Sequence, residues 1–532
     1  MNQDTAFRQS LQLVAQRMID LFGNRQNALH QISKAALVSA ITYYLVLKTF
    51  DAFFGPLRNI PGPFKFKFMD VVYASKAPGK ANIACVDSWR YFKNLQKTYG
   101  QVVRVGPRHI LIADKDMLRQ VLLKDDLPKG PLYERLNRSN DDNAGTVFST
   151  TDKTFHKKRR RVVSPAFSTK YINSLEHYMA DILESFIKRI DNDIENSFDP
   201  HTGYGTVDIW ILLQYLALDV IAETAFGGTF HLLDGGDHIV PQVVSQNMKL
   251  ASHIASHPFL GRLSLLFSAR RLLAANVQLQ EFMKKLIVGR IESGEAGRRN
   301  DILQFLIDTQ QNADESLTAN AIAEETVLFL IAGSETTSNS TGFAIIQLIK
   351  NPHVFKKLRD EIDAVPMNDD QKFFTHAQIQ KLPYLNAVIN ETLRMDSIAA
   401  NGLQRRADRD MVLGGRLFIP KGTIVHCNVY DAHLNPNYWP EPEKFDPERW
   451  LEGSSTPPDM DAYFPFSIGS RNCIGKTFAL QEMRLSIALL VKMFDFSATK
   501  QELEDAQDRS SFITLGVHKN SFMVQIKRRQ QQ

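Results

Sequence analysis

Cys473 is the residue with the clearest chemical potential in this sequence, and it is one of only three cysteines. It lies in the segment 466–475 (FSIGSRNCIG), between two glycines and directly before an apolar stretch, 476–494, that predicts a helix. Glycines let a backbone pass close to a flat cofactor, and N–H groups at a helix N-terminus stabilise a thiolate. We therefore expect Cys473 to be the thiolate ligand of a haem iron, which would favour cleavage of the O–O bond. The alternative is a buried structural cysteine.

A second chemical grouping lies within a long helical pattern, 318–350, which Asn351-Pro352 ends. The segment 332–337 (AGSETT) places Gly333, Glu335 and Thr336 in the middle of this pattern. Gly333 weakens a helix, but it leaves room over a flat cofactor. The Thr336 hydroxyl can bond to a helix carbonyl or to oxygen at the cofactor, and Glu335 can relay protons toward it. We expect Glu335 and Thr336 to be catalytic; the alternative is ordinary side chains that face solvent.

Four segments together resemble the cytochrome P450 monooxygenases, in the order typical of that family. The haem-binding loop matches 466–475, and the oxygen-activation motif matches 332–337. A third match joins Glu391-x-x-Arg394, on a predicted helix 382–395, to the segment 445–450 (FDPERW). The fourth is 156–160, where the family usually has Trp-x-x-x-Arg and this chain has His in the Trp position. The resemblance covers roughly residues 60–528 and looks most like filamentous-fungal, microsomal members.

The resemblance implies a mainly α fold with small β-sheets, a triangular helix-rich domain that holds haem between the long helix and the cysteine loop. The implied cofactor is iron protoporphyrin IX, with Cys473 as the axial ligand of the iron. Its propionates would be bound by arginine, which forms bidentate contacts with carboxylates, and by histidine, which can donate a hydrogen bond. The expected cofactor-binding residues are His156, Arg160, Arg405, Phe466, Arg471 and Cys473. Both Arg405 and Arg406 are candidates for one propionate, and spacing favours Arg405.

The resemblance also implies that Glu391, Arg394 and Arg449 form a buried charged network behind the cofactor. A lone buried charge is costly, so the three should act as a unit. We interpret this network as structural, because it would lock the cysteine loop rather than touch the substrate.

The implied reaction inserts one oxygen atom from O2 into a hydrophobic small molecule, such as a terpenoid, steroid, fatty acid or xenobiotic. The role would lie in secondary metabolism or detoxification. Electrons would come from NADPH through a separate flavoprotein reductase, with cytochrome b5 as a second candidate partner, because no flavin or dinucleotide fingerprint is present. The predicted substrate-facing positions are Phe329, Ala332, the loop 132–147, the segment 397–402 and the turn 514–516. Two other classes stay open: a haem isomerase or dehydratase acting on peroxides, and a non-catalytic haem sensor.

The N-terminal region predicts a membrane attachment. Residues 1–34 are polar, and 35–54 form a probable membrane anchor if Lys48 snorkels and Asp51 lies at the interface. A buried helix is the alternative. The proline-rich segment 55–64 then predicts a stiff hinge, followed by a monooxygenase domain over 65–528 and a basic, polar tail over 529–532. We expect the endoplasmic reticulum membrane, with the catalytic domain facing the cytosol.

Overall composition argues against nucleic acid as a partner and against a disulfide framework. The net charge of +5 is too small to argue for nucleic acid. The basic run 157–161 could be read as a nucleic-acid or nuclear-localisation patch, but it lacks interleaved aromatic residues and fits docking of an acidic redox partner better. Three widely spaced cysteines do not form a disulfide framework.

The elements that must position these residues follow from local patterns. Residues 101–113 predict a β-hairpin, and Asp114 predicts the N-cap of a helix that ends at Leu123. Amphipathic helices are predicted over 170–196 and 274–293. Short strands are expected over 406–425, and 431–465 should be largely irregular.

Overall fold

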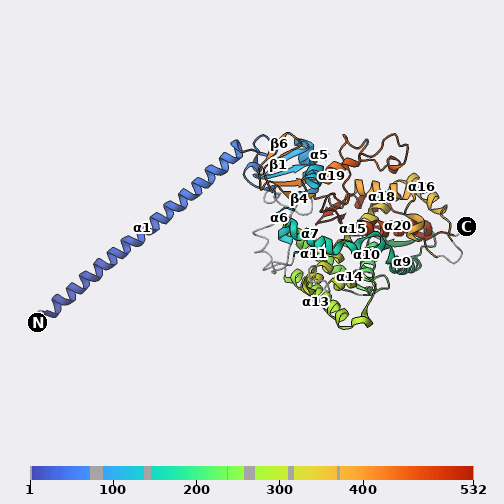
Figure 1. The fold of residues 1–532 in the computed structure, drawn as a ribbon, viewed down its shortest axis with the longest axis horizontal. Helices are drawn as coiled ribbons and strands as arrows, with labels where there is room; N and C mark the ends of the chain where they lie inside the picture. Colours follow the sequence, from blue (N-terminus) through green and yellow to red (C-terminus); the bar gives the residue numbers. More distant parts are fainter. Residues whose placement is uncertain are drawn as a thin grey trace.

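The computed structural model describes residues 3–71, 88–136, 145–236, 238–256, 270–309, 317–367 and 372–530. Its first element, α1 (Gln3–Phe54), is a single helix that projects from the rest of the chain (Figure 1). The polar segment and the predicted anchor are therefore parts of one continuous helix. Cys85 and residues 137–144 of the predicted substrate loop lie outside the described residues.

Two helices of the described chain are long and apolar enough to cross a membrane, and they differ in burial. The first is His30–Phe54 within α1, which is almost wholly exposed; the second is α10 (Ile209–Phe226), which is mostly buried in the core. At 1.5 Å per residue, the 25 residues of His30–Phe54 span about 37 Å, more than the ~30 Å hydrocarbon thickness of a bilayer. Burial identifies α10 as a core helix, while α1 leaves its apolar surface uncovered.

The rest of the chain is mainly helical with small sheets, which confirms the expected fold class. Its helices of five residues or more, besides α1 and α10, are α4 (Ser88–Tyr99), α5 (Lys115–Arg119), η2 (Gln120–Lys124), α6 (Pro131–Leu136), α7 (Lys153–Val163), α8 (Thr169–Ser174), α9 (Glu176–Asn196), α11 (Val240–Ser256), α13 (Arg270–Glu292), α14 (Ile302–Asp308), α15 (Ala319–Lys350), α16 (Pro352–Asp363), α18 (Pro383–Met395), α19 (Val429–His433), α20 (Lys476–Met493) and α21 (Lys500–Asp505).

The long helix α15 has the predicted bounds, since the Thr318 side chain caps its N-terminus and Asn351 ends it. The predicted helix 170–196 is wrong in one respect. It is interrupted at Leu175, where φ is −94° and ψ is 0°, so that α8 and α9 are separate helices. Leu175 is fully buried, and no glycine or proline marks this break in the sequence. The helix predicted after Asp114 has the expected extent but not one helix type throughout. Asp114 does cap it by accepting a bond from the Met117 N–H at 3.0 Å, but its second half, η2, is a π-helical turn.

A four-stranded sheet also contributes residues to the site that is described below. Its order is β1 (Val102–Gly106), β2 (His109–Ile112), β7 (Ile424–Cys427) and β4 (Leu403–Arg406), in which β2 and β7 are parallel and the other pairs antiparallel. The predicted hairpin is β1–β2. Smaller sheets join β3 (Gly205–Asp208), β11 (Met523–Arg528) and β8 (Phe494–Ser497), pair β5 (Met411–Leu413) with β6 (Leu417–Ile419), and pair β9 (Arg509–Ser511) with β10 (Leu515–Val517).

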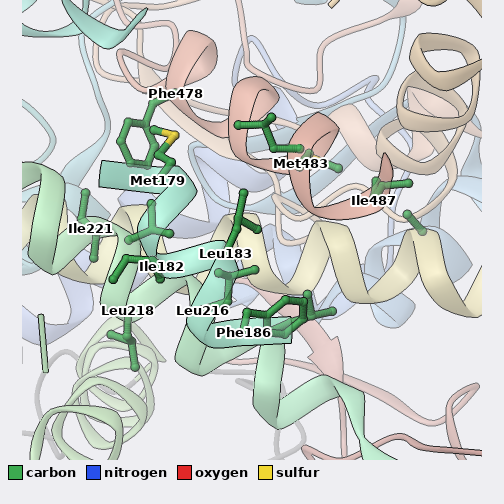
Figure 2. Close-up of a cluster of buried hydrophobic side chains, with 14 of the residues drawn as sticks. Met179, Ile182, Leu183, Phe186, Leu216, Leu218, Ile221, Phe478, Met483 and Ile487 are labelled. Carbon is green, nitrogen blue, oxygen red and sulfur yellow. The ribbon is translucent and has the colours of Figure 1, made fainter. Parts of the chain in front are cut away.

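The main hydrophobic core lies where α9, α10, α15 and α20 meet. Figure 2 shows Met179, Ile182, Leu183 and Phe186 of α9 pointing toward α10 and α20. Fully burying one such side chain contributes about 1.5–3 kcal/mol. Because α20 follows Cys473 and α15 carries Gly333, this core fixes the two helices that bound the site.

Candidate active site

A large cavity of about 770 Å³ lies between α15 and the cysteine loop. Its walls come from segments that are far apart in the sequence: α6, α7, α15, β4, the loop 464–475, α20 and the β9–β10 turn. The core residues Ile221, Phe478 and Met483, labelled in Figure 2, also line it. The fold therefore brings the predicted chemical segments to one enclosed space.

The cysteine loop presents Cys473 to this cavity. The Cys473 N–H donates to the Phe466 carbonyl at 2.8 Å, which closes the loop. Gly469 has a φ of +79°, and a Cβ there would lie 1.9 Å from the Leu122 carbonyl oxygen, so that only glycine fits. Cys473 is exposed to the cavity yet enclosed by the surrounding protein. Burial raises the pKa of its thiol, while the Gly475 N–H and the charges of Arg160 and Lys476 favour the thiolate.

A cluster of cationic side chains lines the same cavity, and the carboxylates of Asp126 and Asp152 act on Arg471 from outside its walls. No Asp or Glu appears among the described residues that form its walls, whereas Lys129, Arg160, Arg405 and Arg471 do. Burial and mutual repulsion lower the pKa of Lys129 well below its usual value and that of Arg471 to about 10. Cations that are grouped, largely buried and mutually repelling favour an anion among them.

Each cation is held in place by backbone groups. The two terminal nitrogens of Arg471 donate to the Thr150 carbonyl at 2.8 Å and the Asp152 carbonyl at 3.1 Å. Arg160 donates to the carbonyl and the side chain of Asn472, both at 2.6 Å. Arg405 is 2 % exposed, whereas its neighbour Arg406 turns outward toward Glu134 on α6. Strand alternation in β4 therefore directs Arg405, and not Arg406, toward the cavity.

His156 and Lys129 complete the cationic wall. The pKa of His156 is lowered to about 3 by burial and by the nearby Arg471, so its imidazole is neutral and can still donate one hydrogen bond. Lys129 donates to the Phe148 carbonyl at 2.6 Å and lies over the rings of Tyr133 and Phe148. Lys129 is not predicted from the sequence, because a single lysine before Gly130-Pro131 carries no recognisable pattern.

The opposite wall is formed by the middle of α15. Gly333 and Thr336 line the cavity, and a Cβ on Gly333 would lie 3.2 Å from Ile221. The Thr336 hydroxyl donates to the Ala332 carbonyl at 2.7 Å. Glu335 is not part of the cavity wall; its carboxylate accepts a hydrogen bond from the Thr514 hydroxyl at 2.8 Å. Of the two expected catalytic residues, Thr336 thus lies at the cavity, whereas Glu335 lies outside its wall.

The charges expected to act as a unit are assembled behind the cysteine loop. Glu391 accepts two bonds from Arg394, at 2.9 and 2.8 Å, and one from Arg449 at 3.0 Å. The Trp450 ring N–H donates a fourth side-chain hydrogen bond to Glu391, at 2.9 Å. All three charged side chains are at most 1 % exposed.

His433 connects this network to the cysteine loop. Its carbonyl accepts a bond from Arg394 at 2.8 Å, and its Nε2 accepts one from the Phe464 N–H at 2.7 Å. Phe464 lies two residues before Phe466, where the loop closes onto Cys473. The network therefore supports the loop through a continuous set of hydrogen bonds.

The predicted substrate-facing residues are only partly at the cavity. Phe329, Ala332 and Thr514 line it, as do most members of 397–402 and the described ends of the loop 132–147. Ser397, Ala400, Leu515 and Gly516 do not belong to its lining. Cys427 is fully buried in a second hydrophobic cluster, so it offers no thiol to the site.

Comparison with known proteins agrees with this arrangement. The sequence model of the cytochrome P450 family matches residues 86–526. The chain is 31% identical over 485 residues to the cytochrome P450 monooxygenase LUC2 of a Fusarium species, covering 90% of each chain. It is 33% identical to acrD of Aspergillus aculeatus, over 88% of this chain and 90% of that one. Benzoate 4-monooxygenase bphA of Aspergillus niger is 28% identical over 506 residues.

The chain belongs to the cytochrome P450 family, and it is a monooxygenase of that family. The family uses a haem-thiolate cofactor and molecular oxygen. The cavity fits that cofactor: it offers one thiol, a grouped set of cations for two propionates, and a glycine-bearing helix opposite the thiol.

Proposed function

We propose that this enzyme binds haem through Cys473 and inserts one oxygen atom from O2 into a hydrophobic small molecule, with electrons from NADPH. The observation that carries the proposal is the enclosed cavity, which has Cys473 on one wall and Thr336 on the other. Bound haem supplies the oxygen chemistry itself, and thiolate ligation tunes it toward O–O cleavage. The protein's own residues hold the cofactor, exclude water and deliver protons.

The propionates would be held by the cationic wall of the cavity. Arg160, Arg405 and Arg471 are the charged donors, and His156 adds a neutral one. Arginine suits carboxylates because its planar group forms two parallel hydrogen bonds. We add Lys129 to this set, since it lies among the same charges and has no acidic partner on the cavity wall. Phe466, which lines the cavity and accepts the Cys473 N–H, would shield the thiolate.

The substrate would be a bulky apolar compound of the terpenoid, steroid, fatty acid or xenobiotic classes. Apart from its cationic wall, the cavity is lined mainly by Leu, Ile, Val and aromatic side chains, as most small-molecule sites are. The small residues Ala399 and Gly402 are among those that line the cavity. The similarity to fungal monooxygenases supports a role in secondary metabolism or detoxification.

The exposed face of α7 would bind the electron donor. Lys157 and Lys158 point outward, while Arg160 on the same helix reaches the cavity. A reductase with an acidic surface would therefore dock close to the cofactor, and electrostatic complementarity would speed its association. We propose an NADPH-dependent flavoprotein reductase as the main partner and cytochrome b5 as a second donor.

The apolar end of α1 would anchor the enzyme in the endoplasmic reticulum membrane, with the catalytic domain facing the cytosol. Phe53, Phe64 and Phe68 form an exposed aromatic cluster at the base of this helix, and Lys67 lies over the Phe53 ring. Aromatic and basic side chains together are typical of a membrane interface. This cluster would seat the domain on the bilayer surface.

The proposal is tested by a screen for substrate-induced shifts in the haem spectrum over terpenes, steroids and fatty acids. Each hit is then incubated with NADPH and a fungal P450 reductase, while O2 consumption and products are followed. We expect an oxygenated product whose formation requires NADPH, reductase and O2. Conversion of a peroxide substrate without the reductase would instead favour the isomerase or dehydratase class. Haem binding without reductase-dependent NADPH use for any hit would favour the sensor class.

A further inference from the structure

The Glu335 carboxylate is held by a residue distant in the sequence. It is not part of the cavity wall, and it accepts the Thr514 hydroxyl at 2.8 Å, across 179 sequence positions. Thr514 lies in the turn between β9 and β10, near the C-terminal end of the chain. A side chain from a separate element thus fixes where this acid lies.

The turn that carries Thr514 is itself fastened to α15. The Asn339 side chain, one helical turn after Glu335, donates to the Leu515 carbonyl at 3.0 Å. The Leu515 N–H donates to the Ile398 carbonyl at 3.0 Å. A Cβ on Gly516 would lie 3.2 Å from the Asn339 amide nitrogen, so the turn and the helix are in close contact. The position of Thr514 relative to Glu335 is therefore built into the fold.

The same turn forms part of the substrate cavity. Phe512, Ile513 and Thr514 all line it. Behind the turn, Lys249 of α11 is exposed, lies over the Phe512 ring at 5.8 Å, and acts electrostatically on Glu335. The acid lies between a hydroxyl at the cavity and a lysine open to solvent.

We propose that Thr514 is a positioning residue for oxygen activation, which holds the Glu335 carboxyl between the substrate cavity and the Lys249 side. The inference rests on the proposed role of Glu335 as a proton relay. The β9–β10 turn then has a second role besides contact with substrate. It sets the position and the protonation of Glu335, the acid that supplies protons.

The charges around Glu335 set the direction in which its pKa should change when the Thr514 hydroxyl is removed. Burial raises the pKa of Glu335, whereas the Thr514 hydrogen bond and the charge of Lys249 lower it. Among the described groups, Lys249 is the charged side chain that acts on this acid. Loss of the Thr514 hydroxyl removes one stabilising contact from the carboxylate. The pKa of Glu335 should then rise further, and the acid should stay protonated to a higher pH.

The test compares Thr514→Val, which keeps the shape but lacks the hydroxyl, with Thr514→Ser, which retains it. The Glu335 carboxyl band is titrated by infrared spectroscopy in the resting enzyme and identified by its absence in Glu335→Gln. We expect the midpoint to rise in Thr514→Val and to match the parent in Thr514→Ser. Ile513→Val, which changes the same turn without touching Glu335, is the matched control and should leave the midpoint unmoved.

Turnover supplies a second readout, the fraction of NADPH that is lost as hydrogen peroxide at each pH. In the parent this loss should increase as the pH rises through the Glu335 pKa, and in Thr514→Val the increase should come at a higher pH. A parent-like midpoint in Thr514→Val would overturn the inference. If Glu335→Gln uncouples turnover while Thr514→Val behaves as the parent, the proton role stands and the positioning role fails. If Glu335→Gln changes nothing, the proton role and the inference fail together.

Discussion

Glu482 should weaken the folded state at neutral pH, and its replacement by glutamine should stabilise the enzyme. The residue is on α20, the helix that follows Cys473, and is 5 % exposed. Its Oε2 has no hydrogen-bond partner among the described residues, and no charge compensates it. Burial alone raises its pKa from 4.5 to about 8.

The direction of the effect of Glu482 on stability follows from the linkage between protonation and folding. The unfolded chain loses this proton near pH 4.5, whereas the folded chain keeps it to about pH 8. The group therefore does not weaken the fold below pH 4.5, and its unfavourable contribution grows as the pH rises to about 8. At pH 7.4 the gap of about 2.9 units corresponds to ~4 kcal/mol, at 1.36 kcal/mol per unit. An imperfectly bonded buried amide costs ~1–3 kcal/mol, which leaves a net gain of ~1–3 kcal/mol for Glu482→Gln.

The assay compares urea unfolding of parent and variant at pH 5.5 and pH 8. We expect Glu482→Gln to raise the unfolding midpoint at pH 8 and to have much less effect at pH 5.5. Glu504→Gln, an exposed change on α21, is the control and should shift neither midpoint. An equal effect of Glu482→Gln at both pH values would refute the argument, because it would show that the charged state of Glu482 plays no part.

Three further perturbations test other parts of the account. Glu391→Gln leaves two buried arginines short of a counter-charge and should cost ~3–5 kcal/mol in the free energy of unfolding, measured with urea; a loss below 1 kcal/mol would show that the network is not a unit. Arg104 donates to the carbonyls of Ala52 and Leu57 and so fastens α1 to the domain. Arg104→Met should therefore speed proteolysis of the segment 55–64 about tenfold, which corresponds to ~1.4 kcal/mol in the free energy that holds this segment in place. An unchanged rate of proteolysis would contradict this. Charge reversal at Lys157 and Lys158 together should raise KM for the reductase several-fold and flatten its salt dependence, without altering the haem spectrum; an unchanged KM would exclude this face as the docking site.

The sequence predicts the cavity-lining residues best where local rules apply. The bounds of α15 follow from a capping threonine and an Asn-Pro stop, and strand alternation explains why Arg405 faces inward while Arg406 faces outward. The residues of the cysteine loop are contiguous, so their placement follows from the loop itself. These predictions need no knowledge of distant contacts.

The parts that could not be predicted depend on contacts between distant segments. Lys129 belongs to the cationic wall only because β4, the cysteine loop and α7 bring Arg405, Arg471 and Arg160 around it. The Glu335 carboxylate is bound by Thr514, and no local pattern indicates a partner 179 positions away. The break at Leu175 is set by core packing and not by a helix-breaking residue. Tertiary packing decided each of these outcomes.

The most direct test of the central claim is the carbon monoxide spectrum of the reduced enzyme. The parent and Cys427→Ser, which changes the other described cysteine, should both give a thiolate-type spectrum, because Cys427 is buried away from the cavity. Cys473→Ser should bind haem through the cationic wall and lose that spectrum, since no other described thiol borders the cavity. A thiolate-type spectrum in Cys473→Ser would contradict the assignment of Cys473 as the ligand of the iron.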